Sequence, residues 1–288
     1  MTGTPAVSVI VTEFNGGEFL GIALDSVLNQ TFSDFELIVV DDASTDDAAA
    51  HLKQIQDTRL RVIRNSQNLG PAGARNVGID AARGAYCAFL DHDDVALPFR
   101  LQRQMEFLQS NSAVGLLGSA VEFIDSAGKR PTTIVSMPQA HLEIRWRGLL
   151  ETPMLQSTMM GRSEVVKRHR SDPKFRVNDD WDFAMRVARD TETRNLPEVL
   201  VRCHRHGTNL TTVYRARVNE TAIEIALREI GIELPGFSIS PSEVAELRRV
   251  VFDIRDGAQK RTLDTTRQAL DRFIRLRDAF WQKHSTSG

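Results

Sequence analysis

The chain has few of the features that identify a protein class at first reading. Only two cysteines, Cys87 and Cys203, occur in 288 residues, too far apart in sequence for a paired metal motif or a disulfide framework. Charge of one sign is also missing, because 36 Lys and Arg face 38 Asp and Glu, for a formal net charge of −2. We therefore expect a reduced, cytoplasmic protein with no electrostatic footprint for nucleic acid.

Long apolar runs are absent as well. Runs such as residues 9–11 and 37–40 are far shorter than the roughly 20 residues needed to cross a bilayer. Residues 1–5 carry no basic side chain, so the N-terminus does not resemble a signal peptide. The sequence thus predicts no transmembrane segment.

Short β-branched runs alternate with helical patterns over the first ninety residues. Apolar runs bounded by polar residues predict buried strands at 7–11, 35–40, 60–63 and 85–90. Between the first two, apolar residues recur at helical spacing over 20–28. This repetition predicts an α/β fold with a mostly parallel sheet, in which the C-terminal strand ends share one ligand-binding edge.

The pattern loosens after residue 97 and becomes helical after about residue 209. We predict a helix opened by Pro98, strands at 114–117 and 121–124, a turn at 125–128, a strand that includes 156–158, and a helix at 180–189. The only later strand signal is weak and lies near Phe237. The chain is therefore divided into a catalytic domain, 1–209, and a C-terminal helical extension, 210–288. The extension fits a packed cap, a homodimer interface, a lid or a peripheral contact with an anionic membrane.

Three acidic clusters lie after predicted strands or at a helix start. They are Asp41-Asp42, Asp91-His92-Asp93-Asp94 and Asp179-Asp180. Clustered carboxylates repel unless a cation or a donor-rich ligand lies among them, and hard oxygen ligands favour Mg²⁺ or Mn²⁺. Each cluster alone also fits an acidic turn or a helix cap. No G-x-G-x-x-G follows the first strand, which disfavours a Rossmann dehydrogenase.

Five segments, in order, resemble the inverting family 2 glycosyltransferases of the GT-A fold. They are VSVIVTEFN, LDSVLNQTF, ELIVVDDASTDD, NLGPAGARNVGIDAARGAYCAFLDHDD and NDDWDFAMRVA, within residues 7–209. The resemblance implies a GT-A sheet flanked by helices, a nucleotide-diphospho-sugar donor, usually a UDP-sugar, and Mn²⁺ or Mg²⁺ on the diphosphate. It also implies a glycan or lipid-linked acceptor hydroxyl and a role in cell-surface polysaccharide or glycoconjugate synthesis. The inner face of the membrane is then an alternative to a purely cytoplasmic location.

The same resemblance assigns the binding residues. It implies that the nucleotide and diphosphate contact Thr12, Phe14, Asn15, Asp41, Asp42, Arg75, Asp91 and His92. Asp91-His92-Asp93 is similar to the family's D-x-D motif, with His92 at the variable position. Asp93 and Asp91 are then the expected metal ligands, and His206 is a third candidate. Arg205, beside His206, is expected to offset charge on the leaving group.

Asp180 is the expected catalytic base, with Asp179 as the alternative. Transfer with inversion requires a group that takes the proton of the attacking hydroxyl, and a carboxylate at the acceptor face can do so. The neighbouring Trp181 either lines the sugar pocket or packs in the core. Two departures from the family pattern carry expectations: Glu13 turns away from the diphosphate, and Ala43, where Gly is common, indicates a turn without positive φ.

Two other functions stay open on the sequence alone. A nucleotidyltransferase uses a similar sheet and metal but usually places a basic, Gly-rich loop after the first strand, whereas TEFNGGEF has no basic residue. A non-catalytic nucleotide-sugar-binding module would retain the fold, and the intact acidic clusters argue against it.

Overall fold

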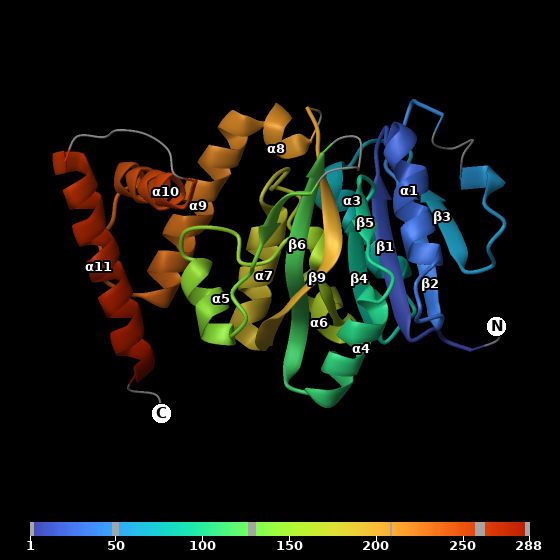
Figure 1. Ribbon diagram of the computed structural model, residues 1–288, viewed down its shortest axis with the longest axis horizontal. Helices are drawn as coiled ribbons and strands as arrows, with labels where there is room; N and C mark the ends of the chain where they lie inside the picture. The colour runs from blue at the N-terminus through green and yellow to red at the C-terminus, as the bar shows by residue number, and fades with distance from the viewer. Residues whose placement is uncertain (1–2, 48–51, 126–130, 208, 257–262, 286–288) are drawn as a thin grey trace.

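The computed structural model describes residues 3–47, 52–125, 131–207, 209–256 and 263–285. Strands and helices alternate through the N-terminal half, as the sequence predicts (Figure 1). This half contains β1 (Val7–Glu13), α1 (Gly17–Leu28), β2 (Phe35–Asp41), β3 (Leu60–Arg64), α3 (Gly70–Ala81), β4 (Tyr86–Asp91), β5 (Asp94–Ala96), α4 (Arg100–Ser110) and β6 (Val114–Asp125). Then come β7 (Pro131–Val135), α5 (His141–Arg147), the 3₁₀ helix η1 (Gln156–Thr158), β8 (Met160–Arg162), α6 (Ser163–His169), α7 (Asp179–Asp190) and β9 (Glu192–Arg205).

Nine strands of the described chain form one sheet. Its order is β3-β2-β1-β4-β8-β6-β9-β5, and β7 pairs with β6. The first four strands in this order are parallel, β8 is antiparallel to both β4 and β6, and β6 is parallel to β9. The parallel part places the carboxyl ends of β1, β2 and β4 along one edge, as expected.

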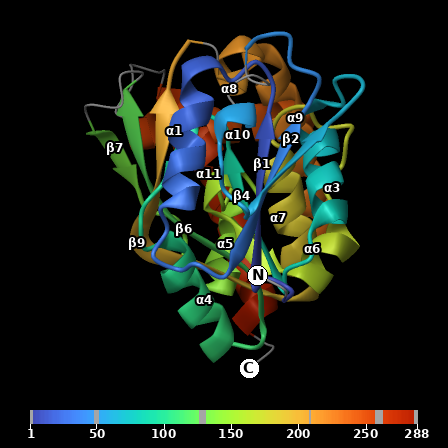
Figure 2. The same ribbon diagram turned by 90° about the vertical axis from the view of Figure 1, so that its right-hand side faces the viewer.

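Helices cover both faces of the sheet. Because successive strand residues point to opposite faces, Val9 and Val11 of β1 pack with α1 and α4, whereas Ile10 packs with α3, α6 and α7. Figure 2 shows α1 and α4 on one side of the sheet and α3, α6 and α7 on the other. β2 reflects this double coverage, since all seven of its residues are buried and the run 37–40 is entirely apolar.

The C-terminal extension is helical, as predicted. It contains α8 (Leu210–Val213), α9 (Arg215–Glu233), α10 (Pro241–Asp256) and α11 (Leu263–Ser285), which stand beside α5 and α7 (Figure 1). A separate apolar cluster joins the extension to α7, and it includes Trp181, Met185, Ile225, Leu247 and Phe280. Within the described residues, no helix combines the length and apolarity that crossing a bilayer requires.

Several predicted elements differ from the structure. The two strands expected at 114–117 and 121–124 are one continuous strand, β6, because Gly118 and Ser119 between them remain extended and buried. Residues 156–158 form the 3₁₀ helix η1 instead of a strand, and Phe237 follows α9 in a turn. The turn expected at 125–128 lies, beyond Asp125, outside the described residues.

Candidate active site

The acidic residues of the three N-terminal strands meet at one edge of the sheet. Thr12 of β1 is in register with Val40 of β2 and with Asp91 of β4, and Glu13 is in register with Asp41. The strand ends therefore bring the first two acidic clusters side by side, as parallel topology predicts.

The loop after β1 is organised by a buried glutamate. Glu13 is 1% exposed; it accepts a hydrogen bond from the Gly16 amide at 2.8 Å and another from the Ser44 hydroxyl. Burial raises the pKa of the Glu13 carboxyl, while the bonds from Ser44 and Gly16 oppose the rise. Asn15 completes the link, because its side-chain oxygen accepts from the Thr45 amide at 2.8 Å. Glu13 thus turns into the protein and ties the β1 loop to the β2 loop.

The turn after β2 contradicts the expectation for Ala43. Its φ is 65°, so this position does adopt the left-handed region that glycine favours. The Ser44 amide donates to Asp41 at 2.8 Å, and Arg64 also pairs with Asp41. The paired neighbours hold the turn although alanine bears a Cβ.

Asp42 binds the loop that precedes α3. Its carboxylate accepts bonds from Asn65 at 2.7 Å, from the Leu69 amide at 2.9 Å and from the Gly70 amide at 2.8 Å. Asp41 and Asp42 are both under 4% exposed. In this structure they shape the walls of the expected nucleotide site, and their contacts with a nucleotide stay a prediction.

Phe14 stands open where the nucleotide is expected. Its side chain is 45% exposed at the tip of the β1 loop, which suits a stacking surface. His92 Nδ1 lies 3.3 Å from the carbonyl oxygen of Thr12, two residues before Phe14. His92 therefore contacts the end of β1 that leads into the loop, and the contact is made by the backbone of Thr12 and not by its side chain.

Arg75 connects the strand edge to α7. It is 4% exposed, forms an ion pair with Asp179, and lies 3.9 Å from Asp91 Oδ1. Burial opposes its charge, but Asp179 and Asp91 raise the pKa of the guanidinium overall. The arginine predicted to reach the diphosphate is thus buried among the carboxylates of two acidic clusters.

Asp180 has the titration behaviour of a base. Burial and the charge of the neighbouring Asp179 raise the pKa of its carboxyl to about 7. The Trp181 amide, which donates to Asp180 Oδ1 at 2.8 Å, acts in the opposite direction and lowers the pKa. Asp179, by contrast, is engaged by Arg75. This asymmetry favours Asp180 over Asp179 as the group that is free to accept a proton.

Asp93 faces the end of β9. His206 Nε2 lies 2.9 Å from Asp93 Oδ2, and the Asn209 side-chain amide donates to the same oxygen at 3.0 Å. Asp91 is the first acid of the D-x-D motif. Burial raises the pKa of its carboxyl, the charge of Arg75 opposes this rise, and the charges of Asp93 and Asp179 add to it. The structure thus brings the D-x-D acid and His206 together, although no group of three or more His, Cys, Asp or Glu suited to a metal forms within the described chain.

Trp181 takes the second of its two expected places, the core, whereas Arg205 does not take the expected one. Trp181 is 1% exposed and donates from Nε1 to the Gly148 carbonyl oxygen at 2.9 Å, so it packs in the core. Arg205 is exposed and stacks on Phe123, with 4.0 Å from its guanidinium carbon to the ring centre. Because side chains alternate along β9, Arg205 points away from the side that His204 and His206 share.

Further polar residues lie at this edge: Gln156 and Ser157, in the segment that the sequence predicts to face the acceptor cleft, and Asn209, which the sequence did not single out. Ser157 Oγ accepts from the Asp91 amide at 3.0 Å, and Asn209 bonds Asp93. The adjacent Gln156 is 5% exposed, and neither polar atom of its amide has a hydrogen-bond partner within the described chain. Gln156 and Ser157 could be found from the sequence because they are two polar residues inside an apolar segment. No comparable sequence feature marks Asn209.

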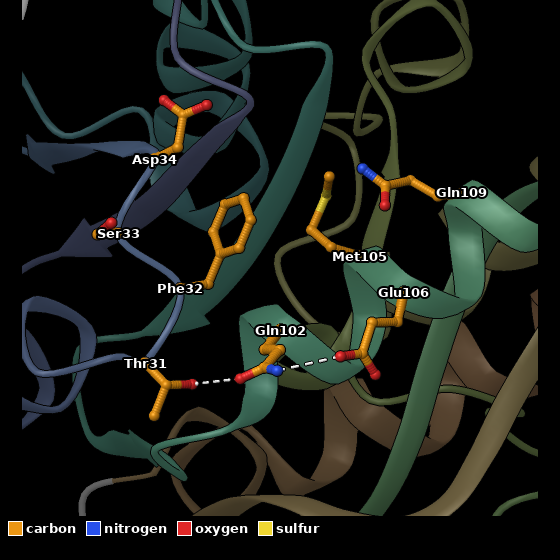
Figure 3. Close-up of a pocket in the computed structure, with 8 residues that line it drawn as sticks. All are labelled: Thr31, Phe32, Ser33, Asp34, Gln102, Met105, Glu106 and Gln109. Carbon is orange, nitrogen blue, oxygen red and sulfur yellow. Dashed lines mark hydrogen bonds between the residues drawn. The ribbon is translucent and has the colours of Figure 1, made fainter.

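A pocket elsewhere on the molecule does not belong to this site. It measures about 410 Å³ and is lined by Thr31, Phe32, Ser33, Asp34, Gln102, Met105, Glu106 and Gln109 (Figure 3). Residues 31–34 precede β2, so the pocket lies toward the amino end of that strand. The acidic edge lies at the carboxyl end.

Known proteins resemble this chain in sequence and in fold. An uncharacterised glycosyltransferase of Haemophilus influenzae is 32% identical over 252 residues, which cover 81% of this chain and 78% of the relative. The Escherichia coli protein WfaP, named UDP-Glc:alpha-D-GlcNAc-diphosphoundecaprenol beta-1,3-glucosyltransferase, is 36% identical over 104 residues, or 36% of this chain and 41% of its own.

A solved structure has the same arrangement of elements. S. aureus TarS 1-349, crystallised with UDP-GlcNAc, superposes with a TM-score of 0.67 at 21% identity, over 94% of this chain and 81% of that one. This likeness confirms the GT-A-type fold. The family model described as Glycosyl transferase family 2 matches residues 8–170, more than half of the chain. The chain therefore belongs to glycosyl transferase family 2 and is a glycosyltransferase.

Proposed function

We propose that the protein moves a sugar, with inversion, from a nucleotide-diphospho-sugar to a hydroxyl of a glycan or lipid-linked acceptor. The donor is a UDP-sugar, and Asp180 is the general base. The carrying observation is the pair Asp179-Asp180 at the start of α7, in which Arg75 engages one carboxylate and the pKa of the other is about 7. A base is most effective when its pKa lies near the working pH.

The donor site that we propose lies over the carboxyl ends of β1, β2 and β4. Phe14 stacks on the nucleobase. The surrounding wall is formed by Thr12, Asn15, Asp41 and Asp42, and Arg75, Asp91 and His92 lie nearby. The exposure of Phe14 and the shared edge of the strands support this placement. Support for a UDP-sugar comes from TarS, whose structure carries UDP-GlcNAc.

We further propose that Asp93, Asp91 and His206 hold Mn²⁺ or Mg²⁺. The residues fit, because the Asp93 oxygen and the His206 nitrogen face one another across 2.9 Å, and such oxygen and nitrogen donors suit Mn²⁺. Few protein ligands suffice, since these cations usually retain oxygens of a substrate phosphate. When bound, the ion neutralises charge on the departing nucleoside diphosphate.

The acceptor proposal uses the residues on the other side of the site. Asp180 takes the proton of the acceptor hydroxyl as the hydroxyl oxygen attacks the anomeric carbon and the bond to the diphosphate breaks. Arg75 keeps Asp179 engaged, so that the unpaired carboxylate is the one that accepts the proton. A lipid-linked acceptor draws support from WfaP, whose name specifies a diphosphoundecaprenol acceptor. With such an acceptor we place the enzyme in polysaccharide synthesis at the inner face of the membrane.

The domain division at residue 209 and a homodimer are also part of the proposal. Leu270, Ile274 and Trp281 are each 38–42% exposed and recur on one face of α11, which suits a second copy of the chain. Size-exclusion chromatography with light scattering measures the oligomeric state. A monomer at all concentrations would refute the dimer.

A thermal-shift screen identifies the donor. Nucleotide sugars are tested with and without Mn²⁺, and a ligand at 100 times its Kd adds about 2.7 kcal/mol of stability. A UDP-sugar that raises Tm only when the ion is present supports both the donor and the metal. Equal shifts for every nucleotide would contradict the donor choice.

The rate of sugar transfer by the Asp180→Asn variant tests the assignment of Asp180 as the general base. We expect kcat to fall by about 10²- to 10⁴-fold, with the KM for the donor nearly unchanged. Asp190→Asn is the matched control, because Asp190 lies at the other end of the same helix with a side chain 52% exposed. A folded Asp180→Asn enzyme as fast as wild type would remove the base assignment. Donor binding without transfer to any acceptor would indicate a binding module.

A further inference from the structure

The turn that precedes α7 is held from outside the catalytic helix. Asn178 comes directly before Asp179 and is left-handed, with φ of 59°, and its side chain does not cap α7. Instead, Asn178 Nδ2 donates to the Val218 carbonyl oxygen at 2.8 Å and to Thr221 Oγ1 at 2.7 Å. Both acceptors lie on α9, so the extension anchors the residue before the acidic pair.

The Thr221 hydroxyl is oriented to accept this bond. It is 2% exposed, and it donates to the carbonyl oxygens of α9 itself, with Arg217 at 2.9 Å and Val218 at 3.3 Å. The hydroxyl oxygen is thereby left as an acceptor for the Asn178 amide. A left-handed residue other than glycine costs about 1–3 kcal/mol and persists where its surroundings over-determine it. The two bonds to α9 supply that constraint.

The same stretch of chain reaches the opposite half of the site. His206 and Asn209 contact Asp93, and α8 and α9 follow them directly in sequence. The segment between β9 and Thr221 therefore joins the Asp93 carboxylate to the turn before Asp180. His206 and Asn209 thus contact the proposed metal side, and Val218 and Thr221, a few turns later in the chain, contact the proposed acceptor side.

The rest of α7 is fixed by separate contacts. Asp182 accepts from Arg186 Nε at 2.8 Å and also pairs with Arg228 of α9, and near the end of α7 Arg189 donates to Glu229 at 2.7 Å. Loss of the Asn178–Thr221 bond therefore leaves most of the α7–α9 interface in place. The bond holds the turn that leads into Asp179 and Asp180, whereas the ion pairs of Asp182 and Arg189 hold α7 against α9.

We infer that Asn178 and Thr221 are positioning residues, through which the C-terminal extension places the Asp180 carboxylate against the acceptor hydroxyl. The inference rests on the proposed function of Asp180. Because Asp180 follows Asn178 by two residues, a change in the Asn178 turn moves the first turn of α7 with its carboxylate. A displacement of about 1 Å at a reacting group costs about 100-fold in rate.

Two substitutions at Thr221 separate positioning from packing. Thr221→Val retains the shape and removes the hydroxyl, whereas Thr221→Ser retains the hydroxyl. We expect Thr221→Val to lower kcat by about 10- to 100-fold and to shift the pH midpoint of kcat, with the KM for the donor within about twofold of wild type. Thr221→Ser is expected to restore both values.

Arg189→Gln is the matched control. It removes the bonds from Arg189 to Glu229, near the far end of α7, while Arg228 continues to pair with both Glu229 and Asp182. It is expected to lower Tm while the pH midpoint of kcat stays at the wild-type value. Wild-type kcat in Thr221→Val, or the same loss of kcat and the same pH shift in Arg189→Gln, would overturn the inference.

Hydrogen exchange tests the turn without any turnover. The Asp182 amide donates to the Asn178 carbonyl oxygen at 3.1 Å, and Thr221→Val is expected to accelerate its exchange while amides near Arg189 keep their protection. Unchanged exchange at Asp182 would contradict the inference. If the wild-type enzyme transfers no sugar at all, the proposed function fails, and the exchange result still decides whether the extension holds this turn.

Discussion

Asp180 carries a carboxyl group whose affinity for protons differs between the folded and the unfolded chain. Burial and the Asp179 charge raise its pKa from 3.8 to about 7 on folding, so the folded state binds the extra proton between these values. The stability that this proton contributes is complete below pH 4 and is lost as the pH rises through 7. The carboxylate at pH 8 therefore destabilises the fold.

We expect Asp180→Asn to unfold at a higher temperature than wild type at pH 8 and at nearly the same temperature at pH 4. Each kcal/mol corresponds to about 2–4 °C in a chain of this size class. Circular dichroism melts at the two pH values measure the difference, with Asp190→Asn for comparison. An identical Tm offset at both pH values would show that the Asp180 titration does not contribute.

Ala43 bears a Cβ in a backbone region that suits glycine. With φ of 65°, replacement by glycine removes steric strain of about 1–2 kcal/mol at the cost of about 0.5–1 kcal/mol in unfolded-chain entropy. We expect Ala43→Gly to raise Tm slightly, and Ala245→Gly, inside α10, to lower it. Differential scanning calorimetry of both variants checks the sign; a fall in Tm for Ala43→Gly would refute the strain.

The candidate site could be predicted from the sequence to the extent that topology determines it. Parallel strands had to bring Asp41 and Asp91 to one edge, and β1 lies between them. The partners of each acid could not be predicted, because the Leu69 and Gly70 amides that bind Asp42 lie far along the chain. The Ala43 turn was mispredicted from residue preference alone, since one of the two bonds to Asp41 that stabilise it comes from Arg64, on β3.

At the scale of elements, Glu233 joins three helices. Arg145 of α5 pairs with it, and Lys283 and His284 of α11 contact Glu233 Oε1 at 2.9 and 2.8 Å. Burial alone would raise the pKa of Glu233, but the bonds from Lys283, His284 and Arg145 lower it. The lowered pKa contributes stability that is present above the unfolded value of 4.5 and is lost as the pH falls through the folded value.

Glu233→Gln is therefore expected to destabilise the fold at pH 7, by about 1.5–3 kcal/mol for a lost charged hydrogen bond. Near pH 3, below the unfolded pKa of 4.5, the difference from wild type should shrink, because the unfolded chain then binds a proton that the folded carboxylate resists. Urea unfolding at both pH values measures it, with Glu220→Gln as the control on the exposed face of α9. A loss of equal size at both pH values would contradict the charge argument.

Elements were predictable where apolar periodicity was strong. β1, β2, β4 and α1 follow directly from buried runs, and each boundary shifted by at most a few residues. The strand expected at 60–63 is present as β3, but it is an edge strand with no buried residue, so its predicted burial was wrong. Residues 156–158 were mispredicted because a three-residue 3₁₀ turn between Leu155 and Met159 has the same apolar flanks as a strand. The Asn178 turn was invisible, since its partners belong to α9.

The whole molecule shares its core across the proposed boundary at residue 209. Trp181 and Met185 of α7 lie in one apolar cluster with Ile225 of α9 and Phe280 of α11. A chain that ends at residue 209 would expose this surface, and burying one large apolar side chain contributes about 1.5–3 kcal/mol. We expect that truncated chain to aggregate on size-exclusion chromatography. A soluble species with cooperative unfolding would show that residues 1–209 fold independently.

The anchoring of Asn178 on α9 bears on how such enzymes exchange parts. A hybrid that joined this catalytic half to a foreign tail at residue 209 would replace Val218 and Thr221, the acceptors that fix the Asn178 amide. Its donor half could recognise the nucleotide as before while its chemistry slowed. A recombined enzyme that remains active would therefore take residues 178–221 from a single parent, with the crossover placed after Thr221.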